Sequence, residues 1–91
     1  MTAPGYWMHE TSGVLRPAVE AYLRGETMTP EQIATMRAYL RQWIMAPAWD
    51  ENPFSTGHDL AELRKRIDWL TTQGAIDAWL RDAELFGVDP L

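Results

Sequence analysis

Residues 29–46 constrain the fold of this chain more than any other stretch. They open on Thr29-Pro30-Glu31-Gln32, a capping box with proline at the first helical position, in which the threonine hydroxyl and the glutamine side chain each bond the other's backbone amide. Apolar residues then recur at helical spacing, at Ile33, Met36, Leu40, Trp43 and Ile44. Pro47 ends the pattern, because its ring cannot continue a helix and disfavours helical angles in the residue before it. An amphipathic helix over about 30–45 is therefore predicted.

Three further segments show the same period, and they predict helices over about 14–24, 58–72 and 72–86. Their inward positions are predicted to be Leu15, Val19, Tyr22 and Leu23; Leu60, Leu63, Ile67 and Leu70; and Ile76, Trp79, Leu80, Ala83 and Phe86. Short connections favour antiparallel neighbours, and the one long connection, 46–57, carries two prolines and the aromatic residues Trp49 and Phe54. We expect an all-α fold of one domain spanning 1–91. It is a small four-helix bundle, built as two helical hairpins joined by a Pro-rich loop, with an N-terminal extension over 1–13.

Charge and composition exclude several classes of function. The chain has no cysteine, so disulfide frameworks and thiolate chemistry are excluded, and no apolar run approaches the ~20 residues of a membrane span. The first ten residues do not resemble a signal peptide, so we expect a cytoplasmic protein. The whole net charge of −5 lies in residues 47–91, because acidic and basic side chains cancel in residues 1–46. Without a basic stripe, nucleic acid is an unlikely partner.

Catalytic and metal-binding motifs are absent from the sequence. The cluster that comes nearest to a metal site is His9, Glu10, His58 and Asp59, and ordinary surface residues explain it equally well. No serine lies in a nucleophile elbow and no glycines have phosphate-loop spacing. We therefore expect no enzyme activity and no cofactor.

Five tryptophans in 91 residues are the remaining signal. Trp43 and Trp79 fall on their helices' apolar stripes and are predicted to be core, whereas Trp69 falls on the polar side of helix 58–72. The uncharged stretch from Trp43 to Trp49 either fills the core or forms an exposed adhesive surface. One interpretation of Trp69 is an ordinary exposed aromatic of a monomer. The other is a binding surface for a basic protein or for a second copy of the chain. Its predicted partner-binding residues are Trp69, Trp49, Trp7, Glu62, Asp68, Asp77 and Asp82.

A DNA-binding alternative uses helix 30–45. Helix 14–24, a turn at Gly25 and helix 30–45 have about the lengths of a helix-turn-helix unit, and Arg37 and Arg41 lie one turn apart. Against this interpretation, the second helix begins Pro-Glu-Gln, and its half of the chain is neutral. The two arginines are otherwise expected to pair with Glu31 or with the acidic half.

The stretches 5–13, 15–23 and 36–49 together resemble small uncharacterised proteins carried by bacteriophages and integrated elements of proteobacteria. They read GYWMHETSG, LRPAVEAYL and MRAYLRQWIMAPAW. The resemblance covers most of the chain and implies a bacterial cell as the setting, with no functional residues to carry over. Small acidic proteins of such elements often bind and block a host protein. The sequence interpretation is thus an inhibitor of a nucleic-acid-handling protein or of a CRISPR defence complex.

Overall fold

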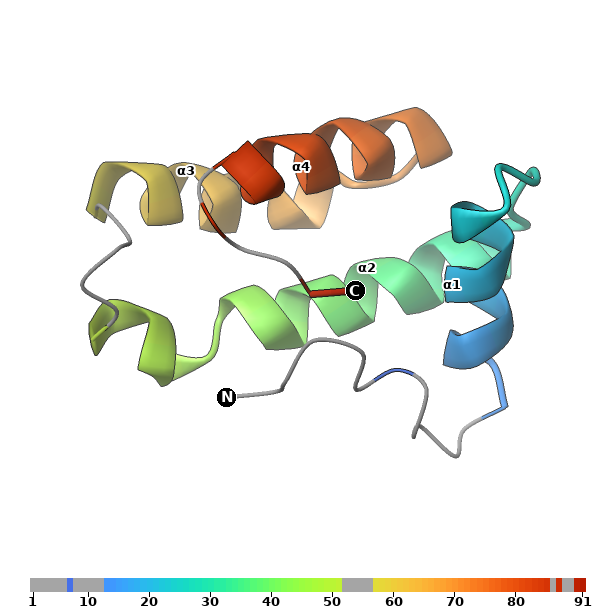
Figure 1. Cartoon of the computed structure of the whole chain (residues 1–91), viewed down its shortest axis with the longest axis horizontal. Coiled ribbons are helices and arrows are strands. Elements are labelled where there is room, and N and C mark those ends of the chain that lie inside the picture. The colour runs from blue at the N-terminus through green and yellow to red at the C-terminus, as the bar shows by residue number, and fades with distance from the viewer. Residues whose placement is uncertain (1–6, 8–12, 52–56, 86, 88–89) are drawn as a thin grey trace.

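The computed structural model describes residue 7 and residues 13–51, 57–85, 87 and 90–91. Its elements are four α-helices and two short 3₁₀ helices, η2 and η3, in the order α1 (Leu15–Leu23), α2 (Pro30–Ile44), η2 (Pro47–Glu51), α3 (Gly57–Arg66), η3 (Ile67–Trp69) and α4 (Gln73–Leu85). No described residue belongs to a strand, so the all-α class is confirmed. Figure 1 shows α1 standing across one end of α2, while α3 and α4 lie together along its other side.

The predicted start and end of α2 are both present. The Gln32 amide donates to the Thr29 hydroxyl at 3.1 Å, and the Thr29 amide donates to the Gln32 side chain at 2.9 Å. The helix ends at Ile44, and Pro47 begins η2. Because both ends are fixed by local chemistry, α2 keeps one register, and that register sets which of its side chains face inward.

The turn from α1 to α2 is closed by backbone bonds and by a side chain of α4. Gly25 has φ +74°, a left-handed conformation that suits glycine, and the amides of Gly25 and Glu26 donate back to the carbonyls of Tyr22 and Ala21 at 3.1 and 2.9 Å. The side chain of Gln73 then accepts from the Met28 amide and donates to the Glu26 carbonyl, both at 2.8 Å. The turn between α1 and α2 is therefore fastened to the start of α4 by the Gln73 side chain.

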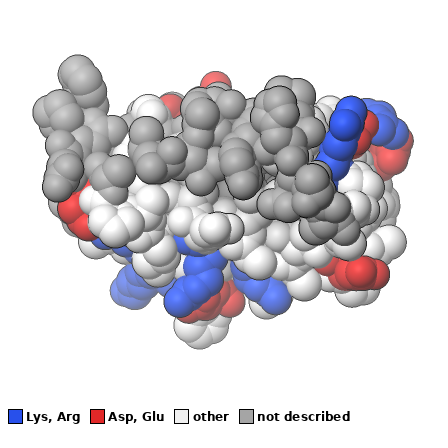
Figure 2. Space-filling model, turned by 90° about the horizontal axis from the view of Figure 1, so that it is seen from below, with Lys and Arg blue, Asp and Glu red and all other residues white. Residues whose placement is uncertain are grey.

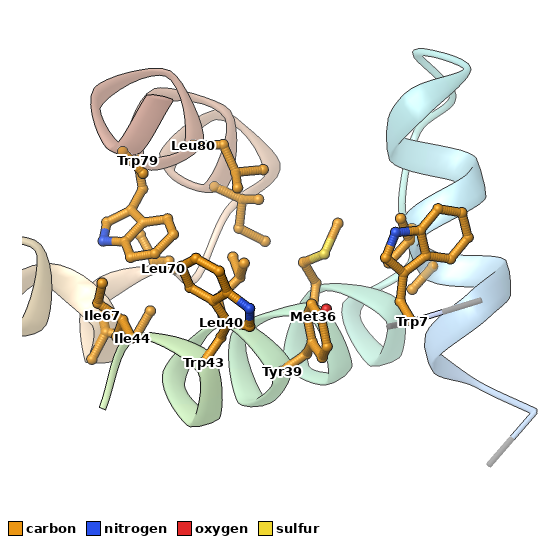
Figure 3. Packing of buried hydrophobic residues seen from close by; sticks show 14 of the residues in the cluster. Trp7, Met36, Tyr39, Leu40, Trp43, Ile44, Ile67, Leu70, Trp79 and Leu80 are labelled. Carbon is orange, nitrogen blue, oxygen red and sulfur yellow. The ribbon is translucent and has the colours of Figure 1, made fainter. Parts of the chain in front are cut away.

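The core lies around α2, which contacts α1, α3, η3 and α4. Its side chains Met36, Leu40 and Ile44 are fully buried. Figure 3 shows Leu40, Trp43 and Ile44 rising from α2 toward Trp79 and Leu80 of α4. The predicted inward positions of α3 and η3, and those of α4 from Ile76 to Ala83, are all buried; Phe86 lies outside the described residues.

The predicted inward face of α1 is wrong at one position. Leu23 is 57% exposed, and the small residues Ala18 and Ala21 are buried in its place. Leu23 is the last residue of α1 and lines an open groove between α1 and α4, so its side chain stays accessible to solvent. The alanines allow α1 and α2 to approach closely where they cross.

The stretch from Trp43 to Trp49 contributes Trp43, Ile44 and Trp49 to the core, whereas Met45 and Pro47 are exposed. The two indole rings meet at a centroid distance of 4.6 Å, and the Trp49 Nε1–H donates to the Trp43 carbonyl at 2.9 Å. The first part of the predicted long connection is thus the 3₁₀ helix η2, and Trp49 of this helix is buried, whereas Phe54 lies outside the described residues. Burying an indole normally requires a partner for its N–H, and here the end of α2 supplies one.

Candidate partner-binding surface

The predicted helix 58–72 changes character before its end. It is α-helical to Arg66, and the turn from Ile67 to Trp69 is the tighter 3₁₀ helix η3. In a 3₁₀ turn, residues three apart eclipse one another. Ile67 and Leu70 accordingly both point inward, at 0% and 2% exposure, which leaves Asp68 and Trp69 on the outside.

A γ-turn follows η3 and redirects the chain into α4. Leu70 has φ −80° and ψ 68°, and the Thr71 amide donates to the Trp69 carbonyl at 2.9 Å, which together describe an inverse γ-turn. Thr72 then starts α4, its hydroxyl accepting from the Ala75 amide at 3.1 Å. The backbone on the C-terminal side of Trp69 is therefore held by hydrogen bonds.

Two arginines of α2 brace the same turn. Arg41 forms a 2.7 Å ion pair with Asp68, and Arg37, one helical turn earlier, donates to the Leu70 carbonyl at 3.1 Å. The Arg41–Asp68 pair is exposed, so its contribution to stability is small, on the order of 0–1 kcal/mol. Its structural effect is local, because it ties Asp68 of η3 to α2, while Arg37 holds the Leu70 carbonyl.

Trp69 stands out from this braced turn. Its side chain is 76% exposed, and among the described residues it forms no hydrogen bond, ring contact or cation–π contact. The sequence prediction that Trp69 lies off the apolar stripe is confirmed. Because the backbone on its C-terminal side is already held, Trp69 has little backbone entropy left to lose on binding.

Two tryptophans predicted to share this surface are instead buried. Trp49 is 5% exposed and packs on Trp43, and Trp7 is 7% exposed, with its Nε1–H donating to the Leu91 backbone oxygen at 3.1 Å. The prediction of a three-tryptophan binding surface is wrong for Trp49 and Trp7. Each indole finds both apolar neighbours and a carbonyl acceptor inside the fold, so neither is left for a partner.

The predicted acidic ring around Trp69 is also wrong in its arrangement. Asp68 pairs with Arg41, and Asp82 pairs with Arg66 at 2.6 Å. Asp77 faces α1, where the Tyr22 hydroxyl donates to it at 2.8 Å. Glu62 is exposed on α3 and forms no ion pair among the described residues. These carboxylates thus serve mainly internal contacts.

Basic side chains, which sequence reasoning did not assign to this site, lie on the two helices next to the turn. Figure 2 shows Lys and Arg side chains gathered along one edge of the face seen from below, with acidic side chains among them. Five of the eight basic residues of the chain lie on α2 and α3: Arg37, Arg41, Arg64, Lys65 and Arg66. Arg64 caps the end of α2 by donating to the Ile44 and Ala46 carbonyls at 3.0 and 3.3 Å. The run Arg64-Lys65-Arg66 could have indicated a basic surface, but the net negative charge of residues 47–91 led to the prediction of an acidic one.

A second concave surface lies between α1 and α4. It consists of a cavity of about 360 Å³ lined by Tyr22, Leu23, Gly25, Gln73, Gly74 and Asp77, and an adjoining one of about 200 Å³ that shares Tyr22 and Leu23. Burial raises the pKa of Tyr22 to about 12, and its hydrogen bond to Asp77 adds to the rise; the same hydrogen bond lowers the pKa of Asp77. Arg81 donates to the other Asp77 oxygen at 2.8 Å. Both Asp77 carboxylate oxygens are therefore engaged in hydrogen bonds within the protein.

The described part of the chain has neither a metal-binding cluster nor a membrane-spanning helix. Within it, no three His, Cys, Asp or Glu side chains come together as a metal site would require. The candidate cluster of His9, Glu10, His58 and Asp59 lies outside the side chains that the structure describes. Nor is any described helix both long enough and apolar enough to cross a bilayer.

Comparisons with family models, with curated proteins and with solved structures each found no match. Function is therefore inferred from the geometry of the Trp69 surface. We define this surface as Trp69 with Asp68, the bracing residues Arg37 and Arg41, and the cations Lys65 and Arg66.

Proposed function

We propose that this protein acts by binding a protein partner through the Trp69 surface, with the Trp69 indole as the central anchor. The observation that carries the proposal is an indole 76% exposed on a turn that two arginines hold in place. Tryptophan and arginine are the residues most enriched at energetic hot spots of protein interfaces. A turn that is already ordered loses little entropy when it docks, which favours tight binding by a small surface.

The resemblance to small phage and integrated-element proteins supports a bacterial host protein as that partner. On this proposal the chain acts stoichiometrically, as an inhibitor of a nucleic-acid-handling protein or of a CRISPR defence complex. Pairing of two copies through Trp69 is the competing outcome, and it is detected by light scattering of the purified protein.

DNA binding by α2 has weaker support. The two arginines that would contact DNA already make intramolecular contacts, Arg41 with Asp68 and Arg37 with the Leu70 carbonyl. A recognition helix needs such side chains free to reach base edges or phosphates.

The test is capture of partners from a proteobacterial lysate by the immobilised protein, with and without nuclease. Trp69→Ala is compared with Leu85→Ala, which removes another strongly exposed apolar side chain, 80% exposed on α4. We expect a nuclease-resistant protein partner that Trp69→Ala loses and Leu85→Ala retains. A partner lost on nuclease treatment, or retained equally by both variants, contradicts the proposal.

A further inference from the structure

The charges that remain around Trp69 after internal pairing are mainly positive. Arg41 is neutralised by Asp68, and Arg66 by Asp82. Arg37 bonds a neutral carbonyl, so its charge stays uncompensated. Lys65 is exposed and forms no ion pair or hydrogen bond through its side chain among the described residues. Two uncompensated cations therefore remain, Lys65 on the helix that leads into η3 and Arg37 at the carbonyl next to Trp69 in sequence.

The nearest uncompensated acid on the same helix face lies farther from Trp69 than Lys65 does. Lys65 precedes Trp69 by four residues, about 7–8 Å along the axis because the last three steps belong to η3, whereas Glu62 precedes it by seven residues, about 12 Å along the axis. At physiological salt, charges are screened over about 8 Å, so Lys65 dominates the field at the indole. The carbonyl end of α3 contributes only about half a negative charge against it.

Taking the proposed function as given, we propose that the partner is an acidic protein segment with an apolar pocket. Carboxylates around the pocket meet Lys65 and Arg37, and the Trp69 indole fills the pocket. The partner charge is thus opposite to that expected from the net charge of −5. Complementary rim charges speed the encounter and select against partners of the wrong sign. The field that matters is local, because distant acidic residues are screened.

Single-stranded nucleic acid is the other anionic ligand that an exposed aromatic among cations suits, because bases stack on such rings. Phosphate backbones are bound by releasing counterions from many lysine and arginine contacts. Only Lys65 and Arg37 keep an uncompensated charge here, and the chain as a whole is acidic. The observations therefore favour a protein carboxylate, and a nucleic acid becomes an outcome of the test.

The local field is tested without any partner, by quenching tryptophan fluorescence with iodide and with caesium. The Trp69 signal is the difference between the native chain and Trp69→Phe, and acrylamide gives its accessibility. We expect the ratio of iodide to caesium quenching for this signal to exceed the ratio for N-acetyltryptophanamide at matched ionic strength by at least about twofold, because the surface attracts anions. A ratio equal to or below that of N-acetyltryptophanamide overturns the inference whatever becomes of the proposed function.

Partner charge is tested with two synthetic helical peptides that share one leucine face and carry either glutamate or lysine on the other. We expect the Glu peptide to bind more tightly, and Lys65→Glu to weaken that binding about tenfold. Arg16→Glu, the same charge change on α1, is expected to leave it within about twofold. A preference for the Lys peptide, or Glu-peptide binding unchanged by Lys65→Glu, contradicts the inference.

Tighter binding of a dT20 oligonucleotide that quenches Trp69 assigns the surface to nucleic acid instead. If the charge results hold but capture is insensitive to Trp69→Ala, only the proposed function fails.

Discussion

Leu40→Ala provides the sharpest test of the packing around α2. Leu40 is 0% exposed and lies in the core between α2 and α4. The substitution removes three carbon atoms, worth about 2.4 kcal/mol at about 0.8 kcal/mol per buried methylene, and the cavity left behind adds to this. We expect a loss of about 3–4 kcal/mol in the free energy of unfolding. For a domain of this size, that lowers Tm by at least about 12 °C.

The assay is urea unfolding followed by circular dichroism at 222 nm, with the m-value checked for constancy. Leu85→Ala is the matched control, because it makes the same chemical change at a side chain 80% exposed, and its expected effect lies within about 0.5 kcal/mol. Equal losses from the two variants would refute the assigned inward face of α2 and the core built on it.

Three further predictions follow from the contacts. The folded state holds the Tyr22 proton more tightly than the unfolded state, since its pKa is about 12 against 10.0, so this stabilisation is complete below pH 10 and lost as pH rises toward 12. Urea unfolding over that range should show the loss in the native chain and a smaller one in Tyr22→Phe. Arg37→Ala should cost about 1 kcal/mol, measured by urea unfolding, because a half-buried hydrogen bond to the Leu70 carbonyl is removed. Gel shifts should reveal no salt-sensitive binding to duplex DNA, because the described basic residues are largely paired internally; a micromolar shift abolished in Arg37→Ala with Arg41→Ala would favour the DNA-binding alternative.

Local signals explain why the helices could be predicted from the sequence. The capping box at Thr29 and the stop at Pro47 are short-range chemistry, so the limits of α2 follow from neighbouring residues alone. Leu60, Leu63, Ile67 and Leu70 are spaced three or four residues apart, and a spacing of three at the end puts both residues on one face in an α-helix or a 3₁₀ helix. Their burial was therefore predictable, although η3 was not. Leu23 fails the same reasoning because its exposure depends on where α4 lies, which no local pattern encodes.

The site was predicted only in part, for a related reason. Trp69 was identified by its angle on the helix, which is a property of sequence spacing. Its charge environment depends on tertiary pairing: Asp68 is neutralised by Arg41, 27 residues away in the sequence, and Asp77 is drawn to Tyr22 on α1. The net charge of a segment does not show which of its carboxylates are paired with arginines elsewhere in the fold.

The most direct test of the central claim is a hydrogen-exchange footprint of the protein bound to its captured partner. Binding through the Trp69 surface predicts slowed exchange in residues 65–71 and in the facing part of α2 around 37–45. The groove between α1 and α4 should exchange as it does in the free protein. Protection confined to that groove, at residues 22–25 and 73–84, would contradict the assignment of Trp69 as the anchor.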